Sequence, residues 1–111
     1  MPRCRVNVTA WSNGQPTSSG TGYGVRVSKD DRAKYFDVGW TEIVLDLGGE
    51  VVVVPVSASF WERCSELRSA AVGRWLLGNR LAPWPKGRPP QLTLRHIADN
   101  RFELGHKPRV G

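Results

Sequence analysis

The sequence of 111 residues has no apolar run of about 18 residues, which is the length that a membrane-spanning helix needs. Residues 1–6 also lack the apolar stretch of a secretory signal peptide. We therefore expect a cytoplasmic protein that does not enter a membrane. Cysteine is scarce, with only Cys4 and Cys64, and in the cytoplasm two reduced thiols are the default state.

Residue types that carry catalysis or hold metals are also few. The two histidines, His96 and His106, lie in a predicted strand and in the C-terminal tail, away from any feature that would activate a nucleophile. With two cysteines they lack the short paired spacings of zinc modules. The glycines Gly20, Gly22 and Gly24 do not have the spacing of a dinucleotide-binding loop, and no Walker lysine follows them. We therefore expect no enzyme, no metal site and no cofactor.

Acidic residues are nearly missing from the last part of the chain. Residues 1–66 carry 7 basic and 8 acidic side chains, whereas residues 67–111 carry 9 basic and 2 acidic ones, so the formal net charge of +6 arises there. Seven of these nine bases are arginine, whose fork donates two parallel hydrogen bonds to a phosphate or a guanine edge. This asymmetry indicates an anionic partner. The alternative is an ordinary solvated surface in an arginine-rich protein.

What is present favours one folded domain over residues 1–111, because a hydrophobic content of 40% is ordinary for such a domain. Alternating apolar residues predict six strands. These strands cover residues 3–11, 22–27, 40–47, 50–56, 91–97 and 101–104. The fourth is nearly all valine, so we expect it to lie centrally in the sheet and to be buried on both faces.

Capping boxes predict where the helices begin. Ser28 opens a short helix after the second strand, and Ser59 opens one main helical segment over about residues 59–78, either as one kinked helix or as two short ones. Within this segment Ser69 is a candidate start of a new helical turn, and Gly78 is the predicted residue just after the helix end. Together these elements predict an α+β fold, a small, partly open six-stranded β-barrel or pseudobarrel.

The remaining segments are loops and a tail. Residues 12–21 contain no apolar side chain and predict a flexible, exposed loop. Residues 81–90 contain four prolines and predict a stiff, extended loop, and residues 106–111 predict a frayed basic tail. We expect four tryptophans in the core, and Cys64 beside them on the apolar helix face. These tryptophans are Trp11, Trp40, Trp61 and Trp75.

Three segments are candidate contact surfaces. The loop of residues 12–21 offers hydroxyl and amide donors to phosphates, or is a plain connector. In the proline-rich loop, Trp84 either stacks on a base beside Lys86 and Arg88 or caps the core. Arg26 and Lys29 lie where the second strand meets the short helix, either as phosphate contacts or as partners of nearby acids. The predicted nucleic-acid-binding residues are Arg26, Lys29, Arg74, Trp84, Lys86, Arg88, Arg95 and Arg101.

The order of a strand, a short helix opened by Ser28-Lys29 and a hairpin turning at Gly48-Gly49 resembles the DNA-binding pseudobarrel superfamily over about residues 22–57. That superfamily includes plant B-three-type domains, effector domains of restriction endonucleases and swapped-hairpin transcription factors. Its members usually have proline before the lysine, where this chain has serine. The resemblance implies a monomeric barrel that grips duplex DNA in the major groove, with Arg26 and Lys29 as candidate contacts.

The sequence therefore predicts a small basic, non-enzymatic nucleic-acid-binding domain whose partner is duplex DNA rather than RNA. One alternative is a protein-interaction or accessory module of a phage or defence system, with a protein partner or a fused effector domain. Another is a reader of a modified base or small ligand with an aromatic pocket built from Trp40, Trp84 or Tyr23. Added salt should weaken nucleic-acid binding steeply, whereas a protein complex should survive it.

Overall fold

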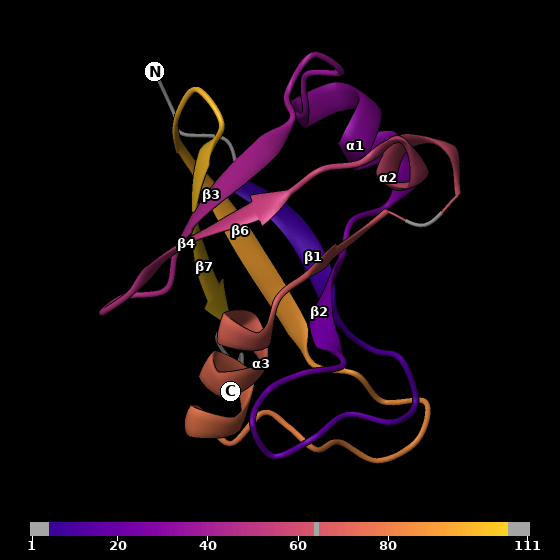
Figure 1. Ribbon diagram of the computed structural model, residues 1–111, viewed down its shortest axis with the longest axis vertical. Helices are drawn as coiled ribbons and strands as arrows, with labels where there is room; N and C mark the ends of the chain where they lie inside the picture. Colours follow the sequence, from indigo (N-terminus) through magenta and orange to yellow (C-terminus); the bar gives the residue numbers. More distant parts are fainter. Residues whose placement is uncertain (1–4, 64, 107–111) are drawn as a thin grey trace.

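The computed structural model describes residues 5–63 and 65–106. Seven strands form one curled sheet in the order β4-β3-β7-β6-β1-β2-β5, with three helices around it (Figure 1). The elements in chain order are β1 (Arg5–Ser12), β2 (Tyr23–Arg26), α1 (Lys29–Tyr35), β3 (Glu42–Asp46), β4 (Val51–Pro55), α2 (Ala58–Glu62), β5 (Glu66–Arg68), α3 (Ala70–Gly78), β6 (Gln91–Ala98) and β7 (Arg101–His106).

The sheet curls into a nearly closed barrel, whose two unpaired edges are β4 and β5. Neighbouring strands pair antiparallel except β3 and β7, which run parallel. The α+β class and the barrel shape are therefore confirmed. The prediction of six strands is wrong, because the three-residue strand β5 adds a seventh beside β2. The barrel is also more closed than predicted, because β5 brings this edge of the sheet close to β4.

The hydrophobic core fills the barrel. Strand residues alternate between its interior and its outer surface, as Val6 and Val8 on β1 show with 1% and 2% exposure. The largest fully buried side chains are Phe102, Ile43, Leu45, Leu67, Leu76, Leu92 and Leu94. Removing this apolar surface from water is the main favourable term in folding, and every strand except the edge strand β4 contributes two or more buried residues or a fully buried leucine.

The valine-rich strand β4 lies at an edge of the sheet and not at its centre. It pairs with β3 alone, and Val51 and Val53 are each 52% exposed, whereas Val54 is 1% exposed. The prediction of a central strand is wrong because a run of valines fits any pleated surface, and here only alternate valines face the core. Pro55 ends the strand, as an edge position allows.

The first predicted helix is confirmed. Ser28 is the N-cap of α1, and its hydroxyl accepts a hydrogen bond from the backbone N–H of Asp31 at 3.1 Å. The C-cap residue Phe36 turns its ring into the core and is 6% exposed. The helix therefore begins where the capping box predicts and closes one end of the barrel with an aromatic ring.

The predicted helical segment of residues 59–78 is two helices separated by β5. The N-cap of α2 is Ser57 and not Ser59, and the Ser57 hydroxyl makes no capping bond. Ser69 is the N-cap of α3, as predicted. Gly78 is the last residue of α3 rather than the stop after it, and Arg80 takes the positive φ of 58° beyond the C-cap. Residues 66–68 were too short a run to show strand periodicity.

The tryptophans lie at the margins of the core. All five are half-buried, so the expectation of core positions for Trp11, Trp40, Trp61 and Trp75 is wrong in degree. Indole combines a large apolar area with an N–H donor, which favours such boundary positions. Cys4, Cys64 and residues 107–111 lie outside the described residues, and His106 ends β7 instead of beginning a tail.

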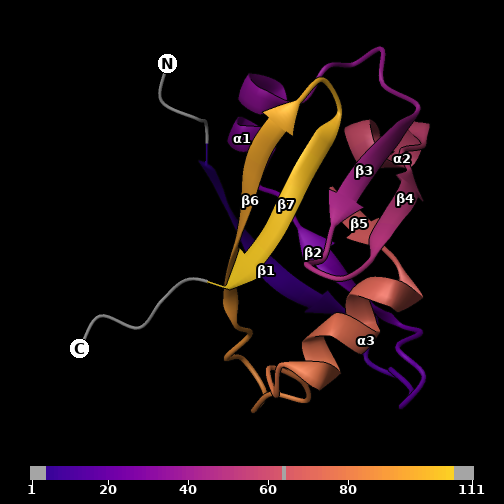
Figure 2. The same ribbon diagram turned by 90° about the vertical axis from the view of Figure 1, so that its left-hand side faces the viewer.

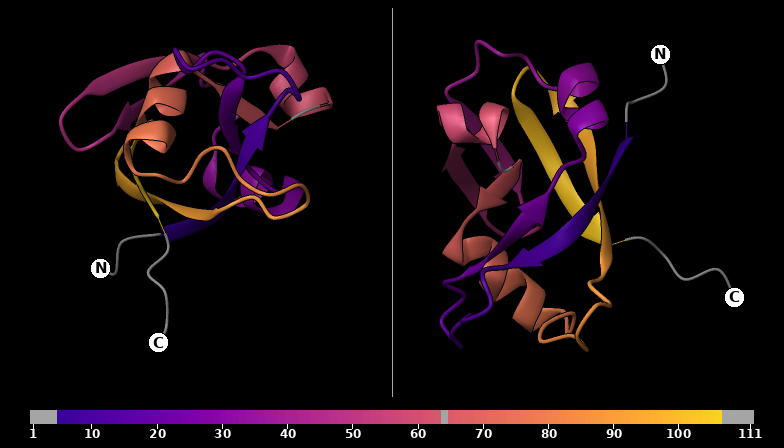
Figure 3. Two further views of the ribbon diagram at one scale, coloured as in Figure 1. Left: turned by 90° about the horizontal axis from the view of Figure 1, so that it is seen from below. Right: turned by 90° about the vertical axis from the view of Figure 1, so that its right-hand side faces the viewer.

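The barrel has two differently built ends (Figures 2 and 3). We call one the basic end; it consists of the loop of residues 13–22, α3 and the loop of residues 79–90. We call the other the aromatic end; it consists of residues 28–41, residues 57–63 and the turn of residues 97–100. No helix in the described part of the chain is long and apolar enough to cross a membrane.

Candidate nucleic-acid interface

The structure separates the eight predicted binding residues into three places. Arg74, Trp84, Lys86 and Arg88 belong to the basic end, on α3 and on the loop of residues 79–90. Arg95 and Arg101 lie on the outer face of β6 and β7. Arg26 and Lys29 lie at the end of β2 and the start of α1. The basic end is thus the only one of these places that holds four of the eight.

A close backbone contact joins the first two segments of the basic end. Gly20 is buried, and an added Cβ on Gly73 of α3 would lie 2.0 Å from the Gly20 carbonyl oxygen. Gly20 also has φ of +97°, which a side chain would strain. The loop of residues 13–22 is therefore fastened to α3 at a point where neither partner tolerates a side chain.

The same loop is shaped by its own backbone. Asn13 N–H donates to the Gly22 carbonyl at 2.9 Å, and Thr17 N–H donates to the Thr21 carbonyl at 2.9 Å. Gln15 and Ser18 between these bonds are exposed. The predicted loop is therefore largely exposed, as expected, but it has defined anchors at both ends.

The proline-rich loop of residues 79–90 is also held at both ends. Leu81 N–H donates to the Leu76 carbonyl at 2.9 Å, and at the far end Ala10 N–H donates to the Pro90 carbonyl at 3.0 Å. Trp84 is half-buried, with its ring centroid 5.7 Å from that of the buried Tyr23. Trp84 thus packs against the core, as its structural alternative predicts, and fixes the middle of the loop.

Lys86 and Arg88 lie in the exposed part of this loop. Arg88 N–H donates to the Pro85 carbonyl at 2.9 Å, which closes a turn that contains Lys86. Both side chains are exposed, and in the described part of the chain no carboxylate lies within ion-pair distance of either. The turn therefore presents two cations to solvent on a stiff support.

Arg74 connects the helix to its neighbours. Its guanidinium donates to the Ser19 carbonyl at 3.4 Å and lies 3.9 Å from the Glu50 carboxylate in the β3–β4 turn. The Arg74 and Glu50 side chains are 54% and 55% exposed, so this pair is weak and solvated. Arg74 remains available to an anion from solution.

Charge is distributed unevenly between the two ends. The segments of the basic end carry four bases and no acid, whereas the aromatic end carries four bases and five acids. The four bases of the basic end are Arg74, Arg80, Lys86 and Arg88, all exposed. A concentration of one charge at one end raises the local concentration of a polyanion.

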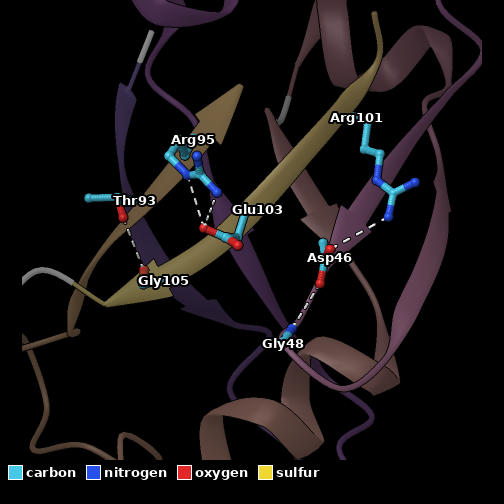
Figure 4. A network of polar contacts seen from close by, with 7 residues as sticks. All are labelled: Asp46, Gly48, Thr93, Arg95, Arg101, Glu103 and Gly105. Carbon is cyan, nitrogen blue, oxygen red and sulfur yellow. Dashed lines mark hydrogen bonds and ion pairs between the residues drawn. The ribbon is translucent and has the colours of Figure 1, made fainter. Parts of the chain in front are cut away.

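The arginines of the sheet face are occupied within the chain (Figure 4). Arg95 contacts the Glu103 carboxylate through Nε at 2.9 Å and Nη2 at 2.8 Å, and the two residues are register partners on β6 and β7. Arg101 lies 3.5 Å from Asp46 on β3. These two predicted binding residues therefore lie on the sheet face and not with the loop cations, and each pairs with an acid across the strands.

Arg26 and Lys29 are close in sequence but belong to different surroundings. Arg26 is the last residue of β2 and lies 3.4 Å from Glu66 on β5. Lys29 opens α1 at the aromatic end, where Asp30 and Asp31 follow it. Sequence reasoning missed Glu66 and Arg68, which flank the buried Leu67 on β5. In the sequence these residues show only a polar-apolar-polar triplet, which is too short to distinguish a strand from a loop.

No group of three His, Cys, Asp or Glu side chains within residues 5–63 and 65–106 is placed to hold a metal ion. The His96 Nε2 atom lies 2.6 Å from the Asp99 carbonyl oxygen in the β6–β7 turn, and its ring packs on Phe102 at 5.0 Å. An open hollow of about 450 Å³ lies beside it, lined in part by Tyr35 and Trp40.

No family model matches the chain, and no significant match was found among curated proteins or among solved structures.

Proposed function

We propose that the chain is a non-enzymatic nucleic-acid-binding domain that contacts duplex DNA through its basic end. One observation carries the proposal: the three segments of this end present four exposed bases and no acid, with Glu50 of the adjoining β3–β4 turn close to Arg74, while the opposite end carries four bases and five acids. Neutralising phosphates with lysine and arginine supplies most of the affinity in non-specific DNA binding.

The two kinds of loop at this end suit different tasks. Lys86 and Arg88, on a turn of the proline-rich loop, reach the phosphate backbone, as does Arg74 from α3. The loop of residues 13–22 carries no charge and exposes Gln15, whose amide offers a donor and an acceptor to base edges in a groove. Phosphate contacts would thus position the barrel, and the polar loop would read the groove.

The test compares two triple variants with the same change in charge. Arg80→Ala, Lys86→Ala, Arg88→Ala removes three bases from the basic end, and Lys29→Ala, Lys34→Ala, Arg63→Ala removes three from the aromatic end. Binding to a short labelled duplex is measured by fluorescence anisotropy over a salt series. Four phosphate contacts predict a loss of about 100-fold in affinity between ~50 and ~200 mM salt for the unmodified protein.

The basic-end variant should lose most of its affinity, and the slope of its log K against log salt should be smaller by about three. The aromatic-end variant should keep nearly the same affinity and slope as the unmodified protein. Equal losses in the two variants would mean that only net charge matters. Absence of duplex binding by the unmodified protein at ~50 mM salt would overturn the proposal.

A second candidate function, a protein-interaction module, is favoured by the exposed edge strand β4. Val51 and Val53 point outward there, and in the described part of the chain β4 pairs with β3 alone, with β5 near its other side. Such an edge can accept a strand from another chain. Val53→Lys would break that contact, so a complex that survives high salt and is lost in this variant would support the module instead.

A further inference from the structure

Three residues on the outer wall of the barrel lie in one row beside the basic end. Trp11 on β1 is the register partner of Gly24 on β2, and Gly24 is the register partner of Arg68 on β5. One row further, Arg26 on β2 pairs with Glu66 on β5. Arg68 directly precedes the α3 N-cap, so this row continues the surface of the basic end.

Glu66 is the fixed centre of the group. Its side chain is 4% exposed, and its carboxylate oxygens lie 3.4 Å from the Arg26 Nε atom and 3.3 Å from the Arg68 Nη2 atom. A buried carboxylate needs charged partners, so Glu66 holds both guanidinium groups in place. The arginine side chains are nevertheless 58% and 62% exposed, so a ligand can reach both from solvent.

Arg68 has a second support. Its Cζ atom lies 4.7 Å from the centroid of the Trp11 ring, in a cation–π contact. The intervening Gly24 has no side chain to block this crossing, and an added Cβ there would lie 2.4 Å from the Leu67 carbonyl oxygen. The guanidinium is therefore oriented from one side by Glu66 and from the other by Trp11.

Two hollows flank Arg68. One of about 270 Å³ is lined by Trp11, Asn13 and Thr21 with the start of α3, and one of about 230 Å³ is lined by Ser57, Ser59 and Glu66. Their polar walls consist of hydroxyl, amide and guanidinium groups, with Glu66 as the one carboxylate among the lining residues. This donor-rich composition suits an oxyanion.

We infer that Arg26 and Arg68, positioned by Glu66, form a phosphate-binding site that takes a backbone phosphate of the same DNA. The inference rests on the proposed function and extends its contact surface from the basic end onto β5, β2 and β1. Glu66 is a positioning residue: it sets the direction of two forks whose remaining N–H groups bind the phosphate oxygens.

Glu66→Gln separates positioning from simple neutralisation by the sign of its effect. The substitution removes a negative charge, so neutralisation alone predicts tighter DNA binding and a steeper salt dependence. Positioning predicts weaker binding, because the arginines lose the buried anion that orients them. Arg68→Lys adds an independent variant, since it keeps the charge but loses the fork and its stacking on Trp11.

The experiment measures anisotropy with the same labelled duplex and salt series, and thermal unfolding to establish that each variant is folded. We expect Arg26→Ala and Arg68→Ala each to lower the salt slope by about one, and Glu66→Gln and Arg68→Lys each to weaken binding about threefold or more. Lys34→Ala, on α1 at the aromatic end, is the control for charge loss.

Unchanged or tighter binding by Glu66→Gln, together with unchanged binding by Arg68→Lys, would overturn the inference. If the basic-end triple variant still abolishes binding in that case, the proposed function stands and only the extension onto β5 fails. If the unmodified protein binds no duplex, the proposed function fails. In that case a titration with inorganic phosphate, followed by NMR at the Trp11 indole N–H, tests the phosphate site by itself. A chemical-shift change that is lost in Arg68→Ala supports the site, and no change in the unmodified protein overturns it.

Discussion

The two ends of the barrel close the same core by different means. At the aromatic end, rings from three parts of the chain meet: Phe36 stacks on Phe102 of β7 at 5.1 Å and lies 5.7 Å from Phe60, and Trp40 lies 6.1 Å from Phe102. At the basic end, a loop and a helix meet backbone to backbone at Gly20 and Gly73. One end is held mainly by aromatic rings, and the other combines this close backbone contact with buried side chains of α3.

This difference has a consequence for the surface of each end. Aromatic packing uses the side chains of its segments to stabilise the fold, and the charges around it balance. Backbone contacts at the basic end leave the side chains of its loops exposed, and there they carry only positive charge. The loops of the basic end thus keep their charged side chains free to meet a ligand.

The largest expected effect tests the aromatic end. Phe102 is fully buried and contacts the rings of Phe36, Trp40 and His96. Phe102→Ala should lower the free energy of unfolding by about 3–5 kcal/mol, because it removes a buried ring and leaves a cavity. Urea denaturation measures this loss. A loss below about 1 kcal/mol would mean that the ring cluster does not hold this end together.

The next effect tests the basic end with a pair of glycines from one helix. Gly73→Ala forces a methyl group into the Gly20 backbone and should cost about 1–3 kcal/mol. Gly78→Ala meets open space and should be neutral or stabilise by up to about 1 kcal/mol, because alanine favours a helix. The two unfolding curves should therefore shift in opposite directions. A shared shift would mean that the close contact is unimportant.

A smaller effect compares two helix caps at the aromatic end. The Ser28 hydroxyl caps α1, so Ser28→Ala should destabilise the protein by about 1 kcal/mol. Ser57 makes no capping bond to α2, and Ser57→Ala should change stability by less than about 0.5 kcal/mol. Thermal unfolding of both variants checks the difference, and equal shifts would contradict the assigned caps.

The smallest effect sharpens the contrast in charge. Glu50 is the acid that lies near the basic end, 3.9 Å from Arg74. Glu50→Gln should tighten duplex binding about twofold by removing a competing negative charge, with no loss of stability. Glu62→Gln makes the same change at the aromatic end and should leave affinity unchanged. Equal gains in affinity from both variants would show that duplex binding depends on net charge and not on where the charge lies.

Much of the fold could be predicted from local patterns. The Ser28 cap, the turn at Gly48-Gly49 and the strands of residues 91–97 and 101–104 depend on neighbours in sequence, and the structure confirms them. The position of β4 and the existence of β5 depend on which strands pair over long distances. A valine run and a three-residue strand carry no local signal of that choice.

The candidate site divides in the same way. Net charge by segment directs attention to the loop with Lys86 and Arg88, and the structure shows both side chains exposed. Sequence could not show that Arg95 faces Glu103 across two strands, or that Arg26 and Arg68 share Glu66, because both facts follow from register. Strand pairing, rather than composition, decides which acid each arginine meets.

The contact between Gly20 and Gly73 also separates what holds the neighbouring loop from what the loop displays. Backbone hydrogen bonds, this one steric fit and the Thr17 hydroxyl, which contacts those of Ser19 and Thr21, set its path, whereas the side chains of Gln15 and Ser18 are exposed. Those positions can therefore diversify while the barrel stays the same. The loop is a natural place for new recognition specificity to evolve, or to be engineered by randomising its tip.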